Sequence, residues 1–116
     1  MPTFNLSGVL ITPATAAAKK VVDLSNGVYD AATGGMRPLP ASIELVGVLG
    51  AAEEIAIEYP LVVDPDPAED GDWAQYYYRD EAVKLTDTNH SETVVSITLF
   101  RLNKPITAAA AGVRIV

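Results

Sequence analysis

A strict alternation of apolar and charged or small residues over residues 54–64 constrains this chain more than any other feature. One parity of the segment is apolar and comprises Ile55, Ile57, Tyr59, Leu61 and Val63. The other parity carries Glu54, Glu58 and Asp64. Because successive side chains of a strand point to opposite faces, this period of two predicts a strand with one buried and one solvated face. Pro60 lies on the solvated parity and removes one backbone donor, so we expect a sheet edge or a bulge there.

Further short apolar runs, separated by turn residues, predict more strands. The expected strands are residues 3–11, 42–49, 73–79, 81–86, 93–104 and 113–116. Asn26-Gly27 lies between the apolar runs 21–24 and 28–29, which predicts a hairpin because both residues tolerate positive φ. No long amphipathic helix is evident. The sequence therefore predicts an all-β fold, a compact β-sandwich or flattened barrel of about eight strands.

Two segments permit more than one interpretation. Residues 12–18 fit either one helical turn, with Thr12 as N-cap and Pro13 at the first position, or an extended arm packed on a neighbour. Residues 31–40 contain Pro38 and Pro40 and are expected to form a loop, either a plain connector or a partner contact. With 116 residues the chain suits a single β-domain over 1–116, in which residues 1–20 are candidates for an N-terminal arm.

The apolar parity changes within residues 93–104. Val95, Ile97 and Leu99 share one parity, whereas Phe100 and Leu102 share the other. Such a switch predicts a bulge, or a twist that passes the strand between two packing surfaces.

Charge and composition exclude several classes of protein. The net charge of −7 comes entirely from residues 53–116, because residues 1–52 carry equal numbers of acidic and basic side chains. An acidic surface repels phosphate, and the largest basic cluster is Lys19-Lys20, so we expect no direct nucleic-acid binding. Cysteine is absent, which excludes thiolate chemistry. No apolar run approaches the roughly 20 residues of a membrane span, so no membrane partner is expected.

Residues 64–72 concentrate carboxylates and are the strongest local signal for a metal ion. An EF-hand alignment with Gly71 at the sharp turn places Asp66 and Asp70 at the first and fifth positions, but Tyr77 replaces the bidentate glutamate. Asp66, Asp70 and Asp72 are therefore weak candidate ligands. We favour a solvated acidic turn made rigid by prolines, and expect no metal and no cofactor.

No combination of residues predicts catalysis. His90 stands alone in a polar turn, without an evident nucleophile or orienting group. The chain has no G-x-S-x-G nucleophile elbow and no glycine-rich phosphate loop. We therefore expect a protein that is not an enzyme and has no catalytic residue.

The aromatic residues concentrate in residues 73–78. On a continuous strand Trp73 and Tyr77 share one face, and Tyr76 and Tyr78 share the other. We expect one face to fill the core and the other to contact a partner or subunit, because tyrosine and tryptophan suit interfaces. A sugar-binding platform and ordinary core packing are the alternatives. The candidate contact residues of the whole chain are Trp73, Tyr76, Tyr78, Phe4, Leu6 and Arg37.

Residues 44–116 resemble the small virion proteins of tailed bacteriophages. The segments that carry the resemblance are 44–50, 55–63, Asp70-Gly71-Asp72-Trp73, 83–86, 97–102 and 105–107 ahead of Gly112-Val113. Proteins of this kind share a β-sandwich or barrel core, an Asp-Gly-x-Trp turn and a late strand with Phe-Arg or Tyr-Arg. The resemblance implies a non-enzymatic head decoration, or cement, protein that binds and stabilises the head lattice.

The same resemblance sets the expected partners and location. It implies contact with the major capsid protein or other virion proteins, and a homo-oligomer, with a trimer favoured by lattice symmetry. It implies a location in the virion, in the phage head, after synthesis in the bacterial host cytoplasm. The alternatives are a carbohydrate-binding β-sandwich module and a small tail or neck component.

Overall fold

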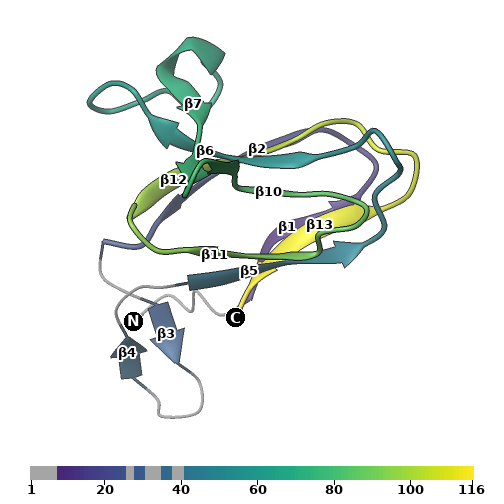
Figure 1. The fold of residues 1–116 in the computed structure, drawn as a ribbon, viewed down its shortest axis with the longest axis horizontal. Helices are drawn as coiled ribbons and strands as arrows, with labels where there is room; N and C mark the ends of the chain where they lie inside the picture. The colour runs from purple at the N-terminus through teal and green to yellow at the C-terminus, as the bar shows by residue number, and fades with distance from the viewer. Residues whose placement is uncertain (1–7, 26–27, 31–34, 38–40) are drawn as a thin grey trace.

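The computed structural model describes residues 8–25, 28–30, 35–37 and 41–116, and these form an all-β sandwich of two facing antiparallel sheets (Figure 1). The first sheet has the strand order β1-β13-β5-β11. Its strands are β1 (Val9–Ala14), β13 (Ala111–Ile115), β5 (Ala41–Gly47) and β11 (Ser91–Val94). The all-β prediction is confirmed.

The second sheet is built around β6 and β12. Its continuous order is β2-β12-β6-β10, and β7 also pairs with β6. The bounds are β2 (Ala18–Asp23), β12 (Leu99–Lys104), β6 (Ile55–Pro60), β10 (Lys84–Leu85) and β7 (Trp73–Gln75). Along β6, the pairing with β12 ends at Glu58, whereas the pairing with β7 continues to Pro60. Pro60 therefore has a neighbouring strand on one side only, which agrees with the sheet edge expected from its missing backbone donor.

The two sheets meet at both sides of the sandwich. On one side β1 leads through residues 15–17 into β2, and on the other β10 leads through residues 86–90 into β11. The turn after β1 is held to the loop between β12 and β13, because the N–H of Thr107 in that loop donates to the carbonyl of Thr15. These corners give the sandwich the character of a flattened barrel (Figure 1).

Residues 93–104 pass from one sheet to the other, with residues 95–98 between β11 and β12. Val94, at the end of β11, is buried from the first sheet, whereas Phe100 and Leu102 on β12 are fully buried from the second. The expected single strand over residues 93–104 is wrong, because β11 ends at Val94 and β12 starts at Leu99. The expected parity switch does not cause the passage, since Val94, Phe100 and Leu102 share one parity. Leu99 is only partly buried, because the core-facing parity of β12 begins at Phe100.

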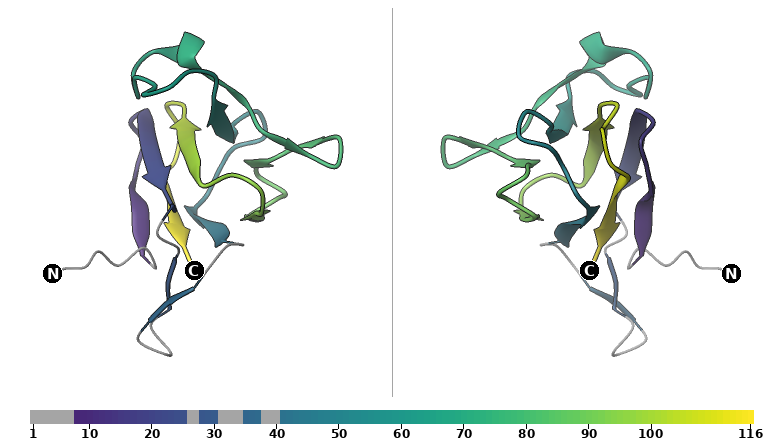
Figure 2. Two further views of the ribbon diagram at one scale, coloured as in Figure 1. Left: turned by 90° about the vertical axis from the view of Figure 1, so that its left-hand side faces the viewer. Right: turned by 90° about the vertical axis from the view of Figure 1, so that its right-hand side faces the viewer.

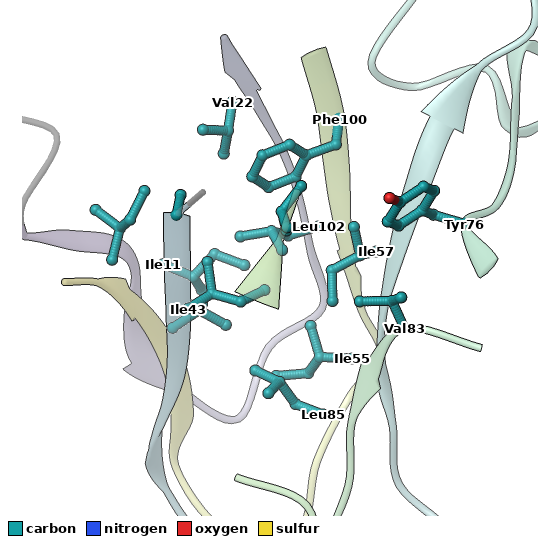
Figure 3. Packing of buried hydrophobic residues seen from close by; sticks show 14 of the residues in the cluster. Ile11, Val22, Ile43, Ile55, Ile57, Tyr76, Val83, Leu85, Phe100 and Leu102 are labelled. Carbon is teal, nitrogen blue, oxygen red and sulfur yellow. The ribbon is translucent and has the colours of Figure 1, made fainter. Parts of the chain in front are cut away.

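The core lies between the sheets and takes side chains from both (Figure 3). The expected inward positions Ile55, Ile57, Val83 and Leu85 are at most 3% exposed. The prediction that every apolar position of the alternation in residues 54–64 is buried is wrong beyond Ile57. Tyr59, Leu61 and Val63 are 37%, 52% and 91% exposed, because β6 ends at Pro60 and the chain leaves the sandwich.

Several expected elements differ in the structure. β2 pairs with β12, and β3 (Val28–Asp30) pairs with β4 (Gly35–Arg37), so the hairpin expected between residues 21–24 and 28–29 is wrong. Asn26-Gly27 itself lies outside the described residues, as do residues 31–34 and 38–40 of the expected loop, which contains β4. The helical turn considered for residues 12–18 is also wrong, because β1 extends to Ala14 and β2 starts at Ala18.

Candidate functional site

The aromatic segment 73–78 is not one continuous strand. β7 ends at Gln75, and β8 (Tyr77–Tyr78) pairs with β9 (Glu81–Ala82) in a separate hairpin. β7 and β10 pair with successive parts of the same edge of β6, and the hairpin leaves the sheet between them. There the N–H of Tyr76 donates to the carbonyl of Ile57, and the N–H of Ile57 donates to the carbonyl of Val83.

Gln75 and Tyr76 fix the base of this hairpin. The Nε2 of Gln75 lies 2.8–3.1 Å from the carbonyl oxygens of Ile57, Tyr76 and Val83. The hydroxyl of Tyr76 is hydrogen-bonded to Oγ of Ser96. These bonds satisfy polar groups where the ladder is interrupted, so the hairpin starts from a defined base.

The hairpin itself projects from the body of the sandwich as the green loop in Figure 2. Its tip residues Arg79 and Asp80 have φ of 54° and 67°, the left-handed pair that a tight two-residue turn requires. The guanidinium of Arg79 lies 5.2 Å from the ring centroid of Tyr78. Tyr77 is 60% exposed and Tyr78 is 38% exposed.

A groove opens beside the base of the hairpin. We call it the aromatic groove, and its walls are Tyr59, Ala74, Gln75, Tyr76, Tyr77 and Ile97. It has a volume of about 550 Å³ and is open to solvent. The amide nitrogen of Gln75 and the hydroxyl of Tyr76 already have partners, so the groove presents mainly apolar surface.

A loop of residues 61–72 leaves the sandwich next to the groove. Its first residues Leu61, Val62 and Val63 expose apolar side chains. The remainder is the carboxylate-rich segment, and three of its side chains make local hydrogen bonds. Asp72 accepts from the N–H of Asp66, Asp66 accepts from Ala68, and Glu69 caps the short 3₁₀ helix η1 (Asp70–Asp72) by accepting from Gly71.

Arg101 anchors this acidic loop from inside the protein. The side chain is fully buried, and its Nε donates to Glu58 Oε1 at 2.7 Å while its Nη1 donates to the carbonyl of Pro67 at 2.8 Å. Its Nη2 forms ion pairs with Glu58 Oε1 at 2.7 Å and with Asp70 Oδ1 at 3.0 Å. The expectation that Glu58 faces water is therefore wrong, because Glu58 neutralises a buried cation.

Trp73 completes the anchor. Its ring lies 5.4 Å from the guanidinium carbon of Arg101, and its Nε1 donates to the carbonyl of Asp66. Asp70 is also hydrogen-bonded to Lys19 at 2.7 Å, and Lys19 together with Arg101 holds the pKa of this carboxyl below its usual value. The loop is thus held by four kinds of contact: ion pairs, backbone acceptors, an aromatic ring and its own caps.

The candidate metal ligands are committed to these contacts. Asp66, Asp70 and Asp72 bind backbone N–H groups, Lys19 and Arg101. Within the described residues no three histidine, cysteine, aspartate or glutamate side chains gather where they could hold a metal ion. The arrangement therefore offers no support for the calcium interpretation.

The candidate contact residues fall into three groups. Trp73 and Tyr76 are 5% and 6% exposed, so their side chains belong to the interior and offer little surface to a partner. Tyr78 is exposed on the hairpin. Phe4 and Leu6 lie outside the described residues, and Arg37 is described only through its backbone pairing with Val28.

Sequence reasoning missed Tyr59 and Ile97 as groove residues and assigned Tyr77 to the same face as Trp73. The sequence did contain a signal for an exposed apolar surface here. The apolar alternation continues past Pro60, where β6 ends, and apolar side chains beyond the end of a strand have no sheet to cover them. His90 is exposed, as expected of a turn residue, and its Nε2 pairs with the carbonyl of Asp87.

Lys104 is a second buried cation, at the opposite end of β12 from Phe100. Its Nζ donates to the carbonyl oxygens of Ala16 and Pro105 and to Oγ1 of Thr107. Burial lowers the pKa of Lys104, and the charge of Glu53 opposes that effect. Ala16 lies in the turn after β1, whereas Pro105 and Thr107 lie in the loop after β12, so Lys104 ties this turn to this loop.

Comparison with protein-family models, with curated proteins and with solved structures found no match to this chain. Within the part of the chain that the structure describes, no helix is long and apolar enough to cross a membrane.

Proposed function

We propose that this chain is a non-enzymatic structural protein that attaches to a larger protein assembly through the end of the sandwich that carries the aromatic groove. The observation that supports this most directly is the apolar surface of the groove, where Tyr59 and Tyr77 are both more than a third exposed and lie beside Ala74 and Ile97. Clustered apolar exposure of this kind is typical of protein interaction sites. A rigid base under it lowers the entropy lost on binding.

The resemblance of residues 44–116 to small phage virion proteins supports a specific form of this proposal. The assembly is a phage head, the protein is a decoration or cement protein, and its partners are the major capsid protein or other virion proteins. Its location is the virion, after synthesis in the bacterial host cytoplasm. The acidic surface accords with a protein that contacts protein and leaves the packaged genome unbound.

Self-association belongs to the same proposal. A decoration protein that fills a junction between capsid subunits gains from matching the local symmetry, which favours a trimer. Other exposed apolar side chains, such as Val9 and Ile106 at 61% and 76%, are available for contacts between copies.

The experiment is to mix the purified protein with phage heads assembled without it, sediment the mixture and measure the protein in the pellet. We expect saturable attachment, with the free protein characterised in parallel by light scattering. A protein that stays in the supernatant at all concentrations, with heads shown to be intact, would reject the decoration function.

The alternative with a specific observation in its favour is a carbohydrate-binding module. Tyr59 and Tyr77 line one open groove, and sugar rings stack on exposed aromatic side chains. A glycan screen with and without chelator tests it. Micromolar glycan binding, together with failure to attach to heads, would favour this alternative. Attachment to tails or necks instead of heads would favour a small tail or neck component.

A further inference from the structure

We propose that the free edge of β2 pairs with β2 of a second copy of this chain, antiparallel and about a two-fold axis at Val21. This contact deepens the self-association in the proposed function and rests on it only in requiring a second copy. It joins copies in pairs, so on a head lattice it links neighbouring three-fold junctions, and the contacts within a trimer use other surfaces.

β2 is a six-residue edge strand with an unbroken register. It pairs with β12 along its whole length, from Ala18 to Asp23, and with no described strand on its other side. β1 is also an edge strand of six residues, but two register shifts interrupt it. A regular edge strand presents a row of unpaired backbone groups that another strand can extend. β2 is therefore the described edge best suited to strand addition.

The outward backbone groups of β2 belong to alternate residues. The N–H of Leu24 donates to the carbonyl of Thr98, which continues the β2–β12 register and makes this a hydrogen-bonded pair. Because such pairs alternate along an antiparallel ladder, every second residue back from Leu24 also bonds to β12. The residues between them direct their N–H and C=O groups away from β12, and none of these groups bonds to another described segment: Lys19, Val21 and Asp23.

The charges of β2 select one register for two antiparallel copies. A shared sheet keeps its core-facing side continuous, so the outward-directed residues of the two copies lie opposite one another. With Val21 opposite Val21 of the second copy, Lys19 of each copy lies opposite Asp23 of the other. A shift in one direction places two Lys20 side chains opposite one another. A shift in the other direction leaves Lys19 without a carboxylate opposite.

Both charged residues have hydrogen-bonding capacity left for this contact. Lys19 and Asp23 are exposed. Nζ of Lys19 donates to Asp70, and an ammonium group has two further donors. Oδ1 of Asp23 accepts from the N–H of Ser25, whereas Oδ2 has no partner among the described residues. Opposite charges in facing positions stabilise strand pairs, and a second copy carries the required alternation of charge.

Lys20 keeps the contact reversible. It lies on the core-facing parity of β2 and yet is exposed, an arrangement that discourages indiscriminate strand addition at an edge. In the proposed register the two Lys20 side chains lie diagonal to one another, where repulsion is weaker than between facing residues. Pairing also uses the β2 edge of both copies, so this contact closes at two chains. We therefore expect a dimer that dissociates readily.

The first experiment follows amide hydrogen exchange of the full chain by NMR as its concentration rises, with sedimentation measuring the fraction paired. Exchange at Lys19, Val21 and Asp23 should slow about tenfold when roughly nine-tenths of the chains are paired, because their N–H groups then become hydrogen-bonded. The amides of Lys20 and Val22 bond to β12 in either state and report the stability of the sheet itself. Exchange at the three outward amides that does not depend on concentration would overturn the inference.

Two charge variants test the register. Asp23→Lys and Lys19→Glu each place like charges opposite one another and should lower the dimer affinity about tenfold or more. An equal mixture of the two variants should restore the dimer, because each then meets opposite charges on the other. Lys20→Thr should strengthen the dimer of the otherwise unchanged protein, since it removes the diagonal repulsion.

Glu81→Lys is the matched control for these variants. Glu81 is exposed on the β8–β9 hairpin, and its replacement changes the net charge by the same amount as Asp23→Lys. It should not weaken the dimer. Circular dichroism checks that each variant is folded. If the mixture of folded Asp23→Lys and Lys19→Glu chains pairs no better than either variant alone, the proposed register is wrong.

Attachment to heads distinguishes failure of this inference from failure of the proposed function. If the chain dimerises through β2 but never sediments with heads, the β2 contact stands and the decoration function fails. If it sediments with heads while the charge variants and their mixture associate as the unchanged protein does, the decoration function stands and the β2 contact is wrong. A trimer whose mass no charge variant changes, with no further pairing, would assign self-association to another surface and reject this contact.

Discussion

At the scale of single residues, the decisive interaction is the pair formed by Arg101 and Glu58. Burying a cation costs several kcal/mol unless a partner neutralises it, and Arg101 is fully buried. Glu58 supplies that partner from the neighbouring strand, where the two residues face each other in the β6–β12 register. The pair also holds the acidic loop, because Arg101 contacts Pro67 and Asp70 as well.

We expect Glu58→Gln to lower the free energy of unfolding by about 3 kcal/mol, because it leaves a buried guanidinium without its main counter-charge. The loss should lie at the lower end of the usual range, since Asp70 remains within reach of Arg101. Urea denaturation measures it. The matched control is Glu44→Gln, which removes the exposed pair with Arg114 and should cost at most about 1 kcal/mol. Equal losses in the two variants would contradict the role given to Arg101.

At the scale of elements, a close backbone approach joins β1 and β13. The pairing of these strands shifts register twice, between Val9 and Ile11 and between Ile11 and Ala14. The irregular strand brings its backbone against Gly112, where an added Cβ would lie 2.3 Å from the carbonyl oxygen of Ile11. Irregular edge strands of this kind also resist pairing with other chains.

We therefore expect Gly112→Ala to destabilise the fold by about 1–3 kcal/mol, because the methyl group forces β1 away from β13. Thermal or urea unfolding of the purified variant measures the loss. Gly8→Ala is the control, since a Cβ at Gly8 meets no atom within 4 Å. A neutral result for Gly112→Ala would mean that β1 can move without cost and that the observed register is not required.

At the scale of the whole molecule, carboxylates fasten loops to the sandwich. Asp70 links the acidic loop to Lys19 and Arg101, and Glu53 accepts hydrogen bonds from the N–H groups of Gly50 and Ala108. Both carboxyls have lowered pKa values. Lys19 and then Arg101 are the main causes for Asp70, and the two backbone hydrogen bonds are the main causes for Glu53.

A lowered pKa in the folded state means that the unfolded chain takes up protons first as the pH falls. Stability from Asp70 and Glu53 is therefore fully present above their unfolded pKa values near 4 and is lost as the pH falls through the lowered folded values. We expect the thermal midpoint to fall on acidification below about pH 4. The fall should be smaller in Asp70→Asn, measured relative to that variant's own value at neutral pH.

Asp64→Asn serves as the control for the acid experiment. Asp64 is exposed and forms no ion pair with another described residue, so this variant should keep the pH profile of the unchanged protein. If Asp70→Asn and the unchanged protein lost stability in parallel, the link between Asp70, Lys19 and Arg101 would not contribute to folding.

The sequence was sufficient for the features that depend on local periodicity. The alternation in residues 54–64 predicted the inward position of Ile55 and Ile57, and the alternation around Phe100 and Leu102 placed these two residues on one face of a strand, where both are buried. These inferences hold because side-chain direction in a strand repeats every two residues whatever the strand pairs with. Turn residues also marked the ends of strands, because their backbone preferences depend on the local sequence.

Only the tertiary structure decided which strands pair and where burial ends. Asn26-Gly27 predicted a local hairpin, but β2 pairs with β12, since distant partners compete with local ones for each edge. Tyr59 and Glu58 are neighbours in one alternating strand, yet Tyr59 lines an open groove and Glu58 neutralises a buried arginine from 43 residues away. Periodicity sets the face of a side chain, whereas the length of the covering sheet and the charge opposite it depend on packing between segments remote in sequence.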